Sequence, residues 1–129
     1  MKIMAVDPGE VRIGLAISDD SGTIARPLKV LRHRSRQEDV NAILREAEAH
    51  GVERIIVGVA LDREGRHGPQ ARKALRLIGK LRENTSLHVE TWDESGSTQQ
   101  AYRGKKKDDM LDARAATVIL QEYLNETET

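Results

Sequence analysis

Four acidic residues at three separate places in the chain carry the side chains that metal chemistry needs. Asp7 follows a short apolar run, and Asp93 and Glu94 close a second one. Asp112 lies near the start of a long amphipathic segment. Carboxylate oxygens are the ligands that Mg²⁺ and Mn²⁺ prefer. A pair of such ions can orient a water nucleophile and neutralise the leaving oxygen of a phosphodiester, so convergence of these carboxylates would permit hydrolysis of that bond.

Each acidic position also has an ordinary structural interpretation. Asp7 precedes Pro8 and Gly9, where an aspartate often accepts a hydrogen bond from the backbone of a turn. Asp93 and Glu94 are adjacent in a predicted strand, so their side chains point to opposite faces and only one of them can face Asp7.

Asp112 is the most informative of the four. Its neighbours on one helical stripe are Ala115, Ala116, Ile119 and Tyr123, so the carboxylate lies on the stripe that should be buried. A carboxylate there is costly unless it is paired, capped or bound to metal. The alternative is a favourable interaction with the helix dipole.

Hydrophobic periodicity and turn residues predict the elements that hold these side chains. Strands are expected over residues 3–6, 11–18, 23–31, 55–59 and 87–92, with Pro27 marking an edge strand. Helices are expected from a capping box at Ser35 to about residue 50, over 69–83, after Ser97 or Thr98, and over 111–124. This order predicts one α/β domain over residues 1–129. Its mixed sheet has three antiparallel and then two parallel strands, with helices on both faces.

Composition narrows the function classes. The 129-residue chain has no cysteine, which excludes thiol catalysis and thiolate zinc sites. No segment has the length and hydropathy of a membrane span or signal peptide, so we expect a cytoplasmic protein that does not associate with membranes. Twenty-one basic residues balance 21 acidic ones. Phosphate contacts would therefore come from local basic clusters, of which Arg103 with Lys105, Lys106 and Lys107 is one.

Taken together, these segments resemble the YqgF/RuvX family of RNase H-like proteins, which is described as containing Holliday junction resolvases and pre-16S rRNA nucleases. The matching segments are Met4-Ala5-Val6-Asp7-Pro8-Gly9, Arg12-Ile13-Gly14-Leu15-Ala16, Ser18-Asp19, Ile56-Val57-Gly58, Gly65, Gly68-Pro69-Gln70-Ala71, Asp93-Glu94, Ser97-Thr98, Asp112, Ala115-Ala116 and Ile119 to Leu124. They span nearly the whole chain in the family's order.

The resemblance implies an RNase H-like fold and cleavage of pre-rRNA or branched DNA with Mg²⁺ or Mn²⁺. It implies that Asp7, the Asp93-Glu94 pair and Asp112 are the catalytic and metal-binding positions, and that Arg12 contacts phosphate. We expect a monomer or a weak homodimer.

Two departures from the family's pattern lie after the Asp-Glu pair. Ser95-Gly96 stands where the family usually has an arginine and a large apolar residue, and the segment from Thr98 to Asp112 is several residues shorter than usual. We expect Lys105, Lys106 and Lys107 to replace part of the lost positive charge and to bind substrate.

The alternative to a nuclease is a catalytically weak or inactive module that binds nucleic acid or ribosomes. A phosphotransferase of the actin-like superfamily is disfavoured because the chain is too short for two lobes.

Overall fold

The computed structural model describes residues 1–61, 64–94 and 111–127, with residue 94 described by its backbone. Its elements are β1 (Ile3–Pro8), β2 (Arg12–Ser18), β3 (Ala25–Arg32), α1 (Arg36–Ala49), β4 (Arg54–Ala60), α2 (Pro69–Asn84), β5 (His88–Glu94) and α4 (Leu111–Thr127). Each strand and helix expected within the described ranges is present. The helix expected after Ser97 or Thr98 falls outside them.

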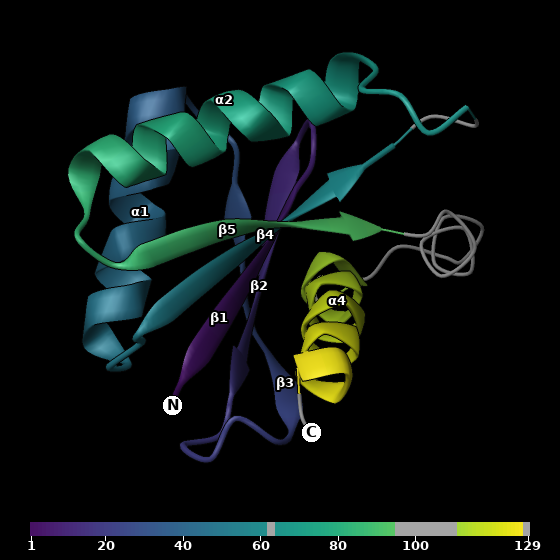
Figure 1. The fold of residues 1–129 in the computed structure, drawn as a ribbon. Coiled ribbons are helices and arrows are strands. Elements are labelled where there is room, and N and C mark those ends of the chain that lie inside the picture. The colour runs from purple at the N-terminus through teal and green to yellow at the C-terminus, as the bar shows by residue number, and fades with distance from the viewer. Residues whose placement is uncertain (62–63, 95–110, 128–129) are drawn as a thin grey trace.

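The five strands form one sheet in the order β3-β2-β1-β4-β5. β1, β2 and β3 pair antiparallel, whereas β4 and β5 run parallel to β1. The predicted mixed sheet is therefore confirmed. β3 is an edge strand, as Pro27 indicated, and its pairing with β2 is irregular beside that proline. Helices α1 and α2 lie on one side of the sheet and α4 on the other (Figure 1).

Side chains alternate between the two faces of the central strand. Met4 and Val6 belong to the core beneath α1 and α2, whereas Ile3 and Ala5 belong to the core beneath α4. Because successive side chains of a strand point to opposite faces, each later residue of β1 can be assigned to the α1/α2 face or to the α4 face. The residues of the neighbouring strands can be assigned in the same way.

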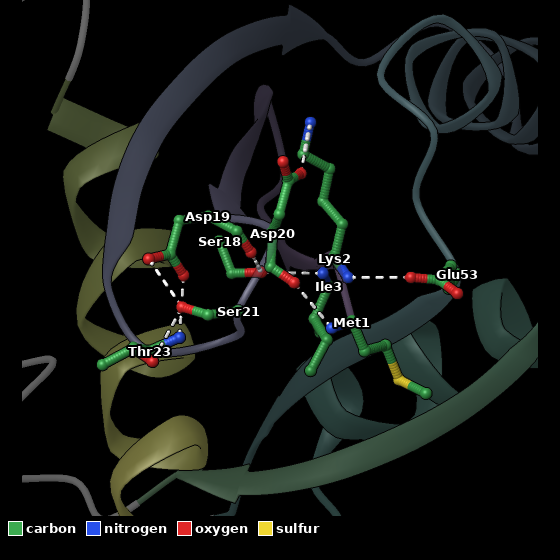
Figure 2. Close-up of polar contacts among 9 residues, drawn as sticks. All are labelled: Met1, Lys2, Ile3, Ser18, Asp19, Asp20, Ser21, Thr23 and Glu53. Carbon is green, nitrogen blue, oxygen red and sulfur yellow. Dashed lines mark hydrogen bonds and ion pairs between the residues drawn. The ribbon is translucent and has the colours of Figure 1, made fainter.

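Polar contacts fix the end of the sheet at which β1 begins. The Ser18 hydroxyl accepts a hydrogen bond from the backbone N–H of Ile3 at 2.8 Å, and the Asp19 carboxylate accepts one from the N–H group of Thr23 (Figure 2). The same carboxylate also accepts a hydrogen bond from the N–H group of Ile24. Those backbone N–H groups hold the pKa of Asp19 below its ordinary value. Ser18 and Asp19, which carry part of the family resemblance, thus have structural roles at the end of the sheet away from Asp7.

Candidate metal and nucleic-acid site

Asp7 lies near the carboxyl end of β1, on the face of the sheet that α4 covers. It continues the alternation of Ile3 and Ala5, which pack against α4, and its residue is half-buried. The register of β1 and β2 places Asp7 directly opposite Gly14. The Cα atoms of such opposed residues lie about 4.5–5.5 Å apart.

Gly14 is the point at which α4 approaches the sheet. A Cβ atom built on Gly14 would lie 1.9 Å from the backbone carbonyl oxygen of Asp112 and 2.4 Å from its carbonyl carbon. No side chain fits in that space. Because glycine has none, the first turn of α4 can contact β2 at this position. Because Asp7 lies opposite Gly14 in the strand register, residues 7 and 112 both adjoin this glycine.

The structure confirms the predicted burial of the stripe on α4 that carries Asp112. Ala116, Ile119 and Tyr123 on this stripe are buried against the sheet, and Asp112 itself is half-buried in the first turn of the helix. Partial burial reduces the solvation of its carboxylate, which strengthens attraction to a cation. The helix dipole also favours a negative charge at this end.

The fifth strand separates the two acidic residues that end it. Val89 packs in the core beneath α1 and α2, whereas Trp92 packs beside Tyr123 in the core beneath α4. Asp93 therefore lies on the α1/α2 face, in register with Val59 of that core, and its residue is exposed. Glu94 follows in register with Ala60, and its side chain is outside the described part of the structure.

Two arginines flank the acidic residues on the α4 face. Arg12 is the first residue of β2 and pairs with Arg32, the last residue of β3. Both are exposed. Arg12 follows the alternation of Gly14, so the pair lies beside the start of α4. The sequence analysis did not find the pairing of Arg32 with Arg12, because that pairing depends on hairpin register. Lys105, Lys106, Lys107 and the Ser95-Gly96 departure lie outside the described residues.

The donor set at this site consists of oxygen atoms, which fits a hard divalent cation. Within residues 1–61, 64–94 and 111–127, no three acidic or histidine side chains gather into a metal-binding group. Among the described side chains, Asp7 and Asp112 are therefore not joined by a third acidic or histidine side chain.

Comparison with known proteins places the chain in a family. Residues 1–126 match the family described as "RuvX: Holliday junction resolvase". The chain belongs to the RuvX family. A relative from Caldanaerobacter subterraneus named "Putative pre-16S rRNA nuclease" is 39% identical over 97% of this chain and 96% of its own length. A relative of the same name from Desulforudis audaxviator is 35% identical over 97% of this chain and 94% of its own length.

Comparison with solved structures shows the fold of this RuvX-family protein. Thermus thermophilus RuvC in complex with a Holliday junction aligns with a TM-score of 0.62 and 15% identity, covering 100% of this chain and 98% of that one. The fowlpox virus Holliday junction resolvase aligns with a TM-score of 0.58 and 15% identity, covering 100% of both chains. The expected RNase H-like fold of this RuvX-family member is confirmed. Among its described helices, none has the length and hydropathy to span a membrane.

Proposed function

We propose that this protein is a metal-dependent endonuclease that hydrolyses phosphodiester bonds in structured nucleic acid. The observation that supports the proposal is the contact between the backbone of Asp112 and Gly14, because Gly14 is the residue opposite Asp7 in the strand register. Two acidic residues placed together without a cation would repel each other. Mg²⁺ or Mn²⁺ would remove that repulsion.

We assign the third ligand to Glu94. Asp93 lies on the opposite face from Asp7, and strand alternation gives position 94 the face that Trp92 has. Bound Mg²⁺ or Mn²⁺ would supply an activated water and neutralise the leaving oxygen. Asp7, Glu94 and Asp112 would hold the ions, while Arg12 and Arg32 would hold the phosphates on either side of the cleaved bond.

The substrate we propose is the precursor of 16S rRNA, cleaved during maturation of its 5′ end, in the cytoplasm. The names of the relatives from Caldanaerobacter and Desulforudis support this choice over four-way DNA. Lys105, Lys106 and Lys107 are proposed as further substrate contacts.

The deciding experiment compares wild type with Asp7→Asn on structured precursor RNA and on a four-way DNA junction, with Mg²⁺ or Mn²⁺. We expect the wild type to cleave the RNA and the variant to lose at least about 100-fold in rate while keeping its circular dichroism spectrum and melting temperature. Equal cleavage by the variant refutes the carboxylate site. Binding by the wild type without cleavage under every metal condition identifies the protein as the inactive binding module instead.

A further inference from the structure

A cavity of about 200 Å³ lies on the face of the sheet opposite to Asp7. Its floor is apolar and consists of Pro8, Ile13, Ala74 and Leu77. Pro8 follows Asp7 in β1, so the two adjacent residues point to opposite faces. The cavity and the carboxylate site therefore share the turn after β1 but not their lining side chains.

The rim of the cavity carries Lys73, which has no acidic partner among the described residues. Three of the four described lysines pair with carboxylates: Lys2 with Asp20 at 3.5 Å, Lys29 with Glu46 at 3.4 Å, and Lys80 with Glu83 at 3.7 Å. Lys73, the fourth, lines the cavity and is half-buried. It makes no ion pair with any residue that the structure describes. A half-buried ammonium group without a counter-charge favours an anion from outside the protein.

A second cation and a helix terminus lie on the same rim. Arg36 is the first residue of α1 and lines the cavity beside Ser35, the N-cap of that helix. Arg36 makes no ion pair within the described part of the chain. The helix N-terminus adds partial positive charge on the side of the cavity opposite to α2.

The one acidic residue in the lining already has partners within the protein. Asp39 is 5% exposed, forms a hydrogen bond with Nδ1 of His33, and accepts another from the backbone N–H of Arg34 at 3.0 Å. Both of its carboxylate oxygens thus have partners within the protein. Lys73 and Arg36 are the lining cations that have no carboxylate partner among the described residues.

The size and chemistry of the cavity decide which anion fits. Since one water molecule occupies roughly 30 Å³, a cavity of about 200 Å³ exceeds what a single phosphate group would need. The apolar floor would remain uncovered beneath such an ion. A ligand with a planar, weakly polar body and one phosphate would cover the apolar floor with its body and contact the cationic rim with its phosphate.

We propose that this cavity binds a nucleoside monophosphate, with its phosphate on Lys73 and Arg36 and its base against Ile13 and Leu77. The nucleotide has two possible sources, a free mononucleotide or a nucleotide turned out of a strand. The proposal does not depend on the nuclease function, because none of the acidic residues of that site lines the cavity.

Isothermal titration calorimetry with uridine 5′-monophosphate, uridine and inorganic phosphate tests the proposal. The monophosphate is expected to bind wild-type protein at least about tenfold more tightly than uridine or phosphate. The Lys73→Glu variant should weaken that binding at least tenfold. Arg76→Glu is the matched control, since Arg76 is an exposed cation on the same helix and does not line the cavity. It should bind within about twofold of wild type.

Three results would overturn the proposal: no binding of the monophosphate at millimolar concentration, equal binding of inorganic phosphate, or equal losses in Lys73→Glu and Arg76→Glu. Lys73→Met retains the aliphatic part of the side chain and removes only the charge. It serves as a second variant in case Lys73→Glu fails to fold. It too should lose the monophosphate. A uridine trinucleotide identifies the source, because tighter binding than the monophosphate indicates a nucleotide within a strand. Asp7→Asn should bind the monophosphate like wild type, so failure of the nuclease proposal leaves this one testable.

Discussion

Gly14 and Asp112 are in backbone contact across the interface between β2 and α4, with the carbonyl oxygen of Asp112 1.9 Å from where a Gly14 Cβ would lie. The contact involves backbone atoms of the helix, which cannot turn away as a flexible side chain can. A methyl group at position 14 must therefore displace the first turn of α4. That turn carries one of the two described carboxylates of the proposed site.

Gly14→Ala is expected to lower the free energy of unfolding by about 2–3 kcal/mol and to reduce cleavage, because overpacking moves Asp112 away from Asp7. Denaturant unfolding gives the first quantity. A cleavage assay gives the second. Fluorescence of the single tryptophan, Trp92, reports whether α4 moves, since its ring packs edge-on against Tyr123 of α4 at 5.5 Å between centroids.

Gly79→Ala is the matched control for this substitution. Gly79 lies within α2, and a Cβ atom there would meet no atom within 4 Å. Replacement of a helical glycine by alanine should stabilise the protein by about 0.5–1 kcal/mol. Equal stability changes in Gly14→Ala and Gly79→Ala would contradict the close approach of α4.

Asp93→Asn and Glu94→Gln separate the two acidic residues at the end of β5. Each replacement removes one negative charge with little change in size. Because Asp93 lies on the face away from Asp7, its replacement should change the cleavage rate less than about threefold. Glu94→Gln should lower the rate about 100-fold and raise the Mn²⁺ concentration needed for half-maximal activity. The reverse ranking would assign the ligand to Asp93.

The double variant Arg12→Gln, Arg32→Gln tests the paired arginines at the end of β2 and β3. If both contact phosphates, the slope of log binding constant against log salt concentration should become shallower by about 1.5–2. Filter binding or fluorescence anisotropy at several salt concentrations measures that slope. Arg26→Gln, at the other end of β3, is the control and should leave the slope unchanged. A double variant with the wild-type slope would remove these residues from the interface.

Glu90 on β5 makes stability depend on pH. Burial alone would raise its pKa, but hydrogen bonds with Tyr123 and His88 and the charge of Arg54 outweigh burial and hold the pKa below its ordinary value of 4.5. A carboxyl with a lowered pKa in the folded state stabilises the protein above the ordinary value, and this contribution is lost as pH falls through the folded-state pKa.

Glu90→Gln should therefore melt at a lower temperature than wild type at pH 7, and the difference should shrink as the pH drops below about 4.5. Thermal melts followed by circular dichroism at several pH values give the two curves. Glu48→Gln, an exposed position on α1, supplies the comparison and should show a small difference at every pH. A gap for Glu90→Gln that stays constant down to pH 3 would rule out this coupling.

The sequence by itself determined the elements and their order. The apolar run of β1 and the cap at Ser35 depend on residues only a few positions apart, so they could be recognised from local spacing. The same spacing placed Asp112 on the buried stripe of α4. The restriction to one member of the Asp93-Glu94 pair followed from this local reasoning, whereas the expectation that Asp7 and Asp112 converge came from the order of the elements and from the family resemblance.

Only the tertiary structure decided how those elements meet. The contact of Gly14 with Asp112, the pairing of Arg12 with Arg32, and the place of Lys73 in the cavity lining each depend on segments that are distant in the chain. Such contacts depend on strand register and on where a helix crosses a sheet. Register and crossing are set by the packing of the whole core, in which each residue's position depends on many others. Local periodicity assigns a residue to one face of its strand or helix. It does not determine which distant residues become its neighbours on that face.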